Sequence, residues 1–144
     1  MSNLDNADQL EIYVLDSFAL LAHLEDEERG VKVTEILKNA QQSDKIILYI
    51  SVVNLGEVYY ITMRERGDLK AREVLALTKM LPIQIINVDL DLTLKASRLK
   101  AKYPVAYADC FAAALATEKD ARIVTGDPEF KKMEREVKIE WLGQ

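Results

Sequence analysis

The sequence has few of the residues on which several common functional sites depend. It contains one cysteine, Cys110, so a single chain can form neither a disulfide framework nor a zinc site of several thiolates. It contains one histidine, His23, which we expect to be a surface or packing residue of the first helix. A nucleophilic triad is therefore disfavoured, and we expect Cys110 to be a small core residue. The low cysteine content is typical of a reducing compartment, so we expect a cytoplasmic protein.

Long apolar runs and phosphate-binding glycine loops are also missing. No apolar run approaches the roughly 20 residues that span a bilayer, so we expect no membrane association. The first residues, "MSNLDNADQLE", lack the basic and apolar regions of a secretory signal, and we interpret residues 1–10 as a flexible tail. Neither a G-x-x-x-x-G-K-[ST] loop nor a G-x-G-x-x-G segment follows the first predicted strand, which disfavours the common modes of nucleotide binding.

Positive charge is in short supply as well, since the formal net charge is −5. Proteins that coat the nucleic-acid backbone are usually basic, because lysine and arginine neutralise the phosphates. The balance therefore disfavours a protein that simply coats DNA or RNA. The negative charge counts less against a nuclease that holds its substrate through bound cations. The carboxylates that bind those cations would themselves lower the net charge.

The composition that is present indicates one regular globular domain, 1–144. The chain is 49% hydrophobic and 30% charged, with only five glycines and three prolines. Short apolar runs predict strands over 11–16, 45–51, 82–88, 121–126 and 137–143. Helical spacing predicts helices over 17–28, 31–42, 52–67, 69–80, 91–103 and 107–120, and a short helical turn over 128–134.

Strands and helices alternate along this order, and the strands are apolar throughout. This pattern predicts an α/β fold, a three-layer α/β/α sandwich with a central, mostly parallel five-stranded sheet. In such sheets the functional site lies outside the carboxyl ends of the strands. Functional residues are therefore expected just after strands and at the starts of the helices that follow.

Four carboxylates stand at such positions, each flanked by apolar or small residues and none beside a basic residue. They are Asp16, Glu57, Asp109 and Asp127. Isolated carboxylates in apolar surroundings are unfavourable unless they are paired or coordinate a metal. Several together repel one another, which a divalent cation would relieve, and oxygen-rich sites suit Mg²⁺ or Mn²⁺. We therefore expect one shared acidic site.

Each acid also has an ordinary structural interpretation. Asp16 could cap the following helix, and Asp109 could favour the positive end of a helix dipole. Glu57 could face solvent, and Asp127 before Pro128 is a common turn pair. These separate interpretations do not explain as easily why all four acids would meet at one edge of the sheet. We expect Gly126 and Pro128 to hold a tight turn that presents Asp127.

The segments around these acids are "YVLDSFALLA", "ISVVNLGEVYYI", "YADCFAAALA" and "IVTGDPEF". In order and spacing the chain resembles a PIN domain, in particular the toxin ribonucleases of VapBC-type toxin–antitoxin pairs, over nearly all of residues 11–142. The resemblance places the family's acidic quartet on Asp16, Glu57, Asp109 and Asp127, and a further acid on Glu129. It matches Ser17 and Thr125 to small hydroxylic residues near the metals. Asn54 is either a polar lining residue or a helix-packing residue.

The resemblance implies metal-dependent cleavage of RNA phosphodiester bonds, with Mg²⁺ or Mn²⁺ held by these acids. Candidate phosphate contacts are Arg64, Arg66, Lys95, Arg98, Lys100, Lys102, Lys131 and Lys132. For any single one of these cations, a solvated helix face is the better explanation. The apolar residues of "VVNLGEVYYITM" and "LKAREVLALTKM" could form a homodimer face and a groove for an antitoxin peptide, or they could fill the chain's own core.

Other functions fit the sequence less well. A phosphoacceptor receiver needs paired acids early in the chain, whereas Asp16 stands alone. A haloacid-type phosphatase needs a second aspartate at the position of Phe18. A non-catalytic PIN-like RNA-binding or scaffold module remains the alternative, although such a module is expected to have lost one of the acids. The sequence leaves open whether the nuclease is a toxin or a housekeeping enzyme.

Overall fold

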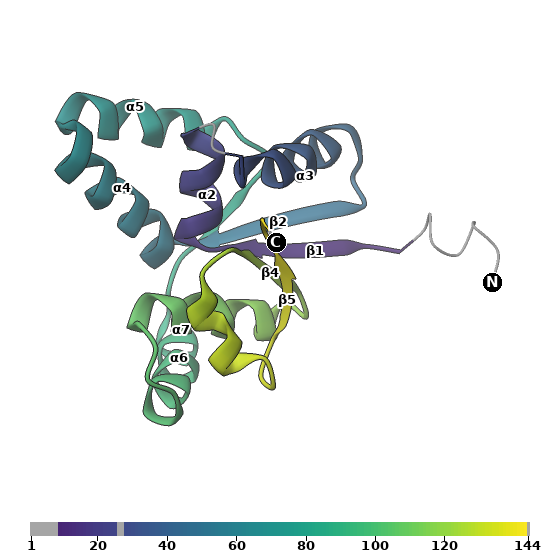
Figure 1. The fold of residues 1–144 in the computed structure, drawn as a ribbon. Helices are drawn as coiled ribbons and strands as arrows, with labels where there is room; N and C mark the ends of the chain where they lie inside the picture. The colour runs from purple at the N-terminus through teal and green to yellow at the C-terminus, as the bar shows by residue number, and fades with distance from the viewer. Residues whose placement is uncertain (1–8, 26–27, 144) are drawn as a thin grey trace.

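A computed structural model describes residues 9–25 and 28–143 of the chain (Figure 1). Its centre is one five-stranded sheet in the order β3-β2-β1-β4-β5, and every neighbouring pair is parallel. The strands are β1 (Glu11–Leu15), β2 (Ile46–Ser51), β3 (Gln84–Ile86), β4 (Arg122–Thr125) and β5 (Lys138–Trp141). The predicted α/β fold and five-stranded sheet are confirmed, and the sheet is wholly rather than mostly parallel.

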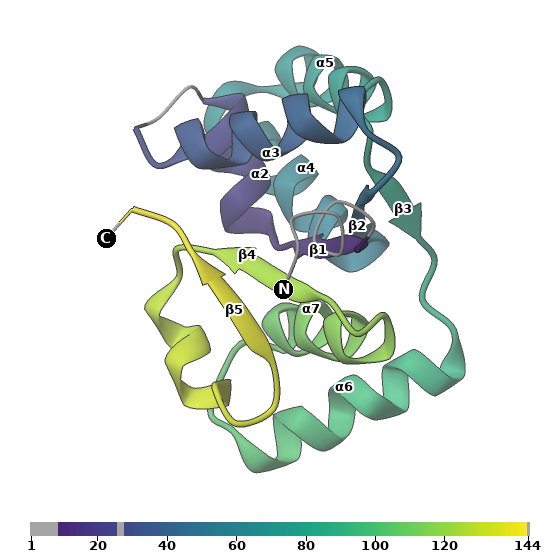
Figure 2. The same ribbon diagram turned by 90° about the vertical axis from the view of Figure 1, so that its right-hand side faces the viewer.

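Helices cover both faces of this sheet (Figure 2). They are α2 (Ser17–Leu24), α3 (Gly30–Gln42), α4 (Val52–Arg66), α5 (Asp68–Lys79), α6 (Leu90–Lys102) and α7 (Tyr107–Glu118), with a 3-10 turn η1 (Pro128–Met133). The helices α2 to α5 lie on one side, and α6 and α7 lie on the other (Figures 1 and 2). The predicted helix 17–28 ends at Leu24, and its residues 26–27 lie outside the described part.

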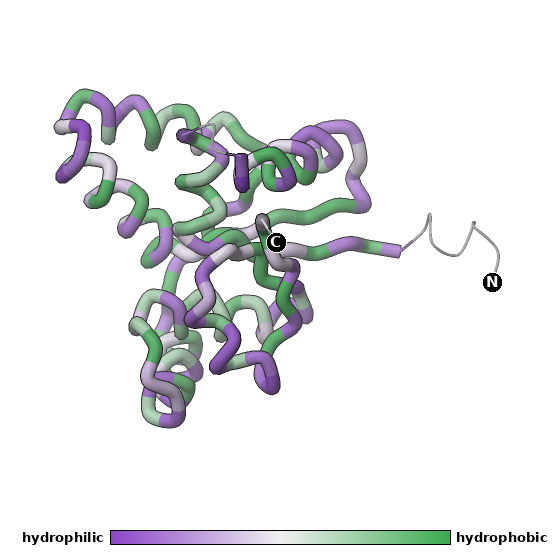
Figure 3. Tube along the Cα trace, viewed as in Figure 1, coloured by the Kyte–Doolittle hydropathy of each residue, from purple (hydrophilic) through white to green (hydrophobic). Residues whose placement is uncertain are grey.

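The core follows from the apolar character of the central strands. Val14, Leu48 and Ile123 are at most 1% exposed, as expected for strands covered on both faces. Figure 3 shows the same arrangement, with hydrophobic strands at the centre and hydrophilic stretches on the outer helices. Helix α7 is buried over eight consecutive residues, because its alanines let it lie close to the sheet. Cys110 belongs to this stretch and is fully buried, which confirms it as a core residue.

Two other expectations concern the periphery. His23 lies between two helices, where its Nδ1 is 2.7 Å from the Thr34 hydroxyl, so it packs α2 against α3. The proposed flexible tail falls mostly on residues 1–8, which lie outside the described residues. Across the described residues, no helix combines the length and apolar character needed to cross a bilayer.

Candidate metal and catalytic site

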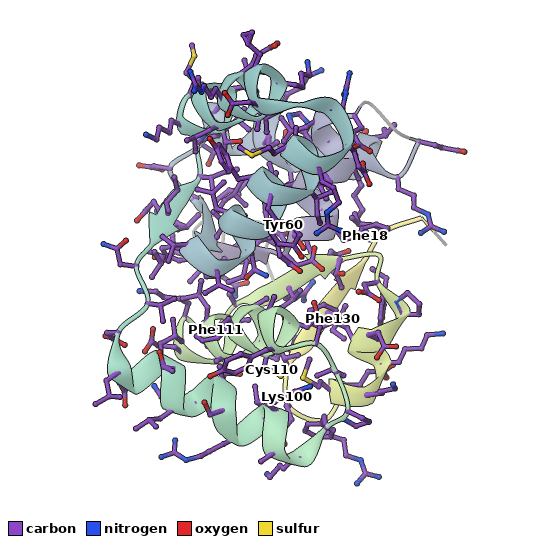
Figure 4. All side chains as sticks on the ribbon, turned by 90° about the vertical axis from the view of Figure 1, so that its left-hand side faces the viewer. Phe18, Tyr60, Lys100, Cys110, Phe111 and Phe130 are labelled. Carbon is purple, nitrogen blue, oxygen red and sulfur yellow. The ribbon has the colours of Figure 1, made fainter. Side chains whose placement is uncertain are left out.

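The strand order fixes where a site is expected. From β1 the chain builds outward through β2 to β3, then returns to place β4 on the other side of β1. The order therefore reverses between β1 and β4, and a crevice opens outside their carboxyl ends at such a switch point. Asp16 directly follows β1, and Asp127 lies two residues beyond the end of β4. Figure 4 looks onto this edge of the sheet.

Asp16 combines a structural and a site position. One carboxylate oxygen caps α2 by accepting a 2.8 Å hydrogen bond from the Ala19 amide, and the other accepts from the Thr125 hydroxyl. The side chain is only 1% exposed. Burial raises the pKa of Asp16 to about 7, which the hydrogen bonds from Thr125 and Ala19 oppose and the charges of Asp109 and Asp127 reinforce. The capping interpretation and the site interpretation therefore describe the same carboxylate.

Thr125 links the two acids at the switch point. Its buried hydroxyl donates to Asp16 and accepts a 3.0 Å hydrogen bond from the Asp127 amide. Asp127 in turn accepts a 3.0 Å hydrogen bond from the Glu129 amide and caps η1. A single hydroxyl thus ties the end of β1 to the loop after β4. The supporting role predicted for Thr125 would depend on these two hydrogen bonds.

The reason for Gly126 differs from the expectation. Gly126 has no positive φ, so the turn does not need the conformational freedom of glycine. A Cβ atom at this position would instead overlap the ring of Phe18. Position 126 therefore requires glycine because there is no room for a side chain. The missing side chain lets the loop that carries Asp127 lie directly against the start of α2.

Asp109 and Glu57 bring two further helices to the same place. Asp109 lies in the first turn of α7 and is 7% exposed. Burial raises its pKa to about 7, reinforced by the charges of Asp127, Glu57 and Glu129. Glu57 lies on α4 and accepts a 2.6 Å hydrogen bond from the Ser17 hydroxyl. Within residues 9–25 and 28–143, no group donates a hydrogen bond to the Asp109 carboxylate or forms an ion pair with it.

The remaining supporting residues differ in their contacts. Glu129 forms a 2.9 Å ion pair with Lys132 while its charge still acts on Asp109. Asn54 is fully buried, and its amide donates to the Ala108 carbonyl at 3.2 Å, one residue before Asp109. Asn54 therefore positions the start of α7, as the packing interpretation expects.

The donor set is all carboxylate, which fits a hard divalent cation. In the described parts of the chain, however, no three histidine, cysteine, aspartate or glutamate side chains converge to hold an ion directly. Asp16, Glu57 and Glu129 each accept a hydrogen bond from a side-chain donor, whereas the bond to Asp127 comes from the backbone amide of Glu129 in its own turn. Mg²⁺ usually keeps several waters and binds one or two protein carboxylates. The arrangement therefore fits a hydrated ion that one or two of the acids bind directly and the others bind through water.

The candidate RNA-binding cations do not form one patch. Lys95 pairs with Glu118 at the far end of α7 from Asp109, about 14 Å away along the helix. Lys95, Arg98 and Lys102 line a depression between α6 and α7, whereas Arg66 lines a groove between α4, α2 and α5. Lys100 donates to the Val105 carbonyl, Lys132 pairs with Glu129, and Lys131 is exposed.

Two candidate cations, Arg64 and Arg66, lie on the same helix as Glu57. The Arg64 guanidinium is 5.0 Å from the centre of the Tyr60 ring. Sequence reasoning missed Tyr60, although its spacing of three residues from Glu57 was a signal that both share a helix face. It also missed Ser51, which caps α4 and holds the Asn54 side chain at 2.7 Å. The serine three residues before an asparagine at a helix start was the available signal.

Comparisons with known proteins concern the family and the fold. A model of the PIN domain matches residues 13–136. A sequence search of curated proteins gives no match. Solved structures that share the fold include VapBC2 from Rickettsia felis bound to a promoter DNA fragment, with a TM-score of 0.72 and 19% identity over 92% of this chain and 99% of that one.

Two further structures extend the comparison. The DNA-bound VapBC from Salmonella typhimurium has a TM-score of 0.71 and 17% identity, over 92% of this chain and 98% of that one. The Sarcin-Ricin loop cleaving toxin VapC20 from Mycobacterium tuberculosis has a TM-score of 0.65 and 18% identity, over 84% and 93%. At these identities the likeness concerns the fold.

Proposed function

We propose that this chain, which belongs to the PIN domain family, is a divalent-cation-dependent endoribonuclease that hydrolyses RNA phosphodiester bonds. One observation carries the proposal. Five carboxylates from four separate segments of the sequence act on one another at the switch point of the sheet, and the pKa values of Asp16 and Asp109 are both raised to about 7. Repulsion of this kind is retained where a cation or a reaction needs it.

The roles of the acids follow from their contacts. Asp109 and Asp127 would hold the cation, and Asp16, Glu57 and Glu129 would hold its water ligands. When bound, Mg²⁺ or Mn²⁺ supplies a Lewis acid that polarises a phosphoryl oxygen and lowers the pKa of an attacking water. Asp16 has one oxygen bonded to Thr125 and one to the α2 amide, so its orientation is fixed.

The neighbours of these acids keep them in place. Ser17 orients Glu57, and Thr125 orients Asp16 and Asp127 through one hydroxyl. Asn54 joins α4 to the α7 start that carries Asp109. Pre-organisation of this kind matters because misplacement of a catalytic group by about 1 Å can reduce the rate about 100-fold.

We further propose that the chain is the toxin of a toxin–antitoxin pair, binds a small antitoxin protein and forms a homodimer. The VapBC complexes that share its fold support the antitoxin. A groove between α2 and α4 offers a site for such a partner. Its lining combines four apolar residues with two acids: Phe18, Leu21, Ala22, Ile61, Glu25 and Glu65. Exposed apolar side chains on α4, on α5 and directly after α5 add to this surface, namely Met63, Leu69, Leu77 and Met80.

The test is cleavage of a panel of tRNA, rRNA fragments and single-stranded RNA by the purified protein with Mg²⁺, Mn²⁺ or EDTA. We expect cleavage with either metal, none with EDTA, and a loss of at least about 1,000-fold in Asp109→Asn. Asp44→Asn is the matched control, because Asp44 is exposed and precedes β2 at the opposite edge of the sheet. Equal cleavage by wild type and Asp109→Asn at saturating Mg²⁺ would contradict the proposal.

A further inference from the structure

One face of α4 runs from the core of the protein out past the acids. Val53, Glu57, Tyr60 and Arg64 are spaced four, three and four residues apart, so they form one stripe along the helix. Val53 packs against the cluster that contains α7, and Glu57 acts on Asp109. Tyr60 follows Glu57 by one turn, about 5 Å along the axis. The stripe therefore leads from the sheet, through the acidic site, to its outer margin.

Tyr60 is an exposed aromatic ring at this margin. Its side chain is 47% exposed, and the Arg64 guanidinium lies 5.0 Å from the ring centre. Figure 4, which looks onto the carboxyl edge of the sheet, labels Tyr60 on the side of the molecule that faces the viewer. An aromatic ring gives a nucleic-acid base a surface on which to stack, and a guanidinium gives a phosphate a charged hydrogen-bond donor.

A second exposed tyrosine, Tyr107, faces a different side of the protein from Tyr60. Tyr107 is 44% exposed and lies two residues before Asp109, so it points to roughly the opposite side of α7. Its hydroxyl is 2.8 Å from the Ser97 hydroxyl of α6, and its ring contacts Phe111 at 4.8 Å. Tyr107 is thus directed to the α6 side, whereas Tyr60 shares the face of Glu57.

We propose that Tyr60 and Arg64 form a stacking platform for an unpaired base next to the scissile phosphate. This inference rests on the proposed function of the acidic site. A tyrosine ring stacks with any base face, and such stacking is independent of hydrogen-bond readout. In a duplex the base faces are already stacked on their neighbours, so the platform favours single strands. Arg64 would contact the phosphate of the stacked nucleotide.

The experiment measures RNA binding in the Asp109→Asn background with Mg²⁺, using labelled oligoadenylate and oligouridylate of equal length. We expect Tyr60→Leu to weaken oligoadenylate binding about tenfold and oligouridylate binding less, because purines stack more strongly. Tyr60→Trp should retain the affinity, and Tyr107→Leu should leave it unchanged. Circular dichroism verifies folding, and sedimentation verifies the oligomeric state of every variant.

The outcomes separate this proposal from the nuclease itself. Metal-dependent cleavage by wild type together with full RNA affinity in Tyr60→Leu overturns the platform and leaves the nuclease standing. Loss of a dimer in Tyr60→Leu, accompanied by the loss of RNA affinity, also overturns it, because Tyr60 would then belong to an interface between copies. Tyr60-dependent binding of RNA that the wild type never cleaves supports the platform and contradicts the nuclease. An absence of both binding and cleavage overturns both.

Discussion

Two groups of charges in this protein show opposite responses to their surroundings. Glu140 on β5 forms ion pairs with Lys32 at 2.6 Å and with Arg122 at 3.2 Å, and its pKa is lowered, chiefly by the hydrogen bond from Lys32. Asp16 and Asp109, by contrast, are buried among other acids, and the pKa of each is raised to about 7. A fold gains from placing Glu140 beside cations and loses from placing the acids together. The acidic site is thus explained by function better than by stability.

The largest effect on stability is expected at Thr125, whose hydroxyl holds Asp16 and the Asp127 amide. Thr125→Val keeps the shape of the side chain but leaves Asp16 and the Asp127 amide without their shared partner. We expect a loss of about 3 kcal/mol in the free energy of unfolding, measured by urea titration in EDTA. Thr125→Ser retains the hydroxyl and should lose far less. A larger loss in Thr125→Ser than in Thr125→Val would show that packing of the methyl group, rather than the hydrogen bonds, holds the site.

Removing one charge from the acidic group should stabilise the metal-free protein. The folded-state pKa of Asp109 lies above its ordinary value of 3.8, at about 7, so the folded chain binds more protons than the unfolded chain between these values. Stability is therefore present at low pH and lost as the pH rises from 3.8 to about 7. Asp109→Asn escapes this loss, and we expect it to be on the order of 2 kcal/mol more stable than wild type at alkaline pH.

The measurement is urea unfolding in EDTA between pH 5 and pH 8, with Asp44→Asn as the exposed control. The stabilisation by Asp109→Asn should shrink toward the acid end of this range. A gain that is the same at all pH values would assign the effect to packing of the amide instead of charge.

The next effect concerns the loop that presents Asp127. Gly126→Ala forces a Cβ atom into the ring of Phe18. We expect a loss of about 1.5 kcal/mol in thermal or urea unfolding, together with reduced cleavage, because the loop or the ring must move. The double variant with Phe18→Leu supplies the space and should recover much of the loss. Failure of this rescue would mean that backbone conformation, rather than space, requires glycine.

The smallest effect on stability is expected for Glu140, the acid that is paired with cations. Glu140→Gln removes both ion pairs, but Lys32 and Arg122 are 45% and 58% exposed, so solvent screens the interaction. We expect a loss of less than about 1 kcal/mol near neutral pH, reduced further by salt. Because the pKa of Glu140 is lowered, the contribution is present above its ordinary value of 4.5 and disappears as the pH falls below it. A salt-independent loss would contradict this account.

Much of the fold could be predicted from local patterns. The apolar runs gave all five strands within a few residues, because buried parallel strands are apolar on both faces. Their parallel pairing and the placement of acids at carboxyl ends followed from the alternation of strands and helices. The burial of Cys110 was equally local, since it lies in an alanine-rich helix.

Contacts between distant segments could not be predicted in this way. The need for Gly126 comes from Phe18, which approaches from another element, whereas the local pattern suggested a turn. The sequence posed capping and site membership as alternatives for Asp16, but its two carboxylate oxygens serve both. Lys95 was grouped with the RNA contacts by charge, yet its partner Glu118 lies far from the acids along α7. These relations depend on three-dimensional approach, which spacing along the chain does not encode.

The most direct test is calorimetric binding of Mn²⁺ to the wild type near pH 6.5, repeated in two buffers of different ionisation enthalpy. Asp16 and Asp109 are partly protonated at this pH, so a cation that binds the acids must displace protons. The account predicts binding accompanied by proton release in the wild type, and weaker binding with less release in Asp109→Asn. Mn²⁺ binding without proton release, or equal in the two proteins, would contradict the claim that these acids form a cation site.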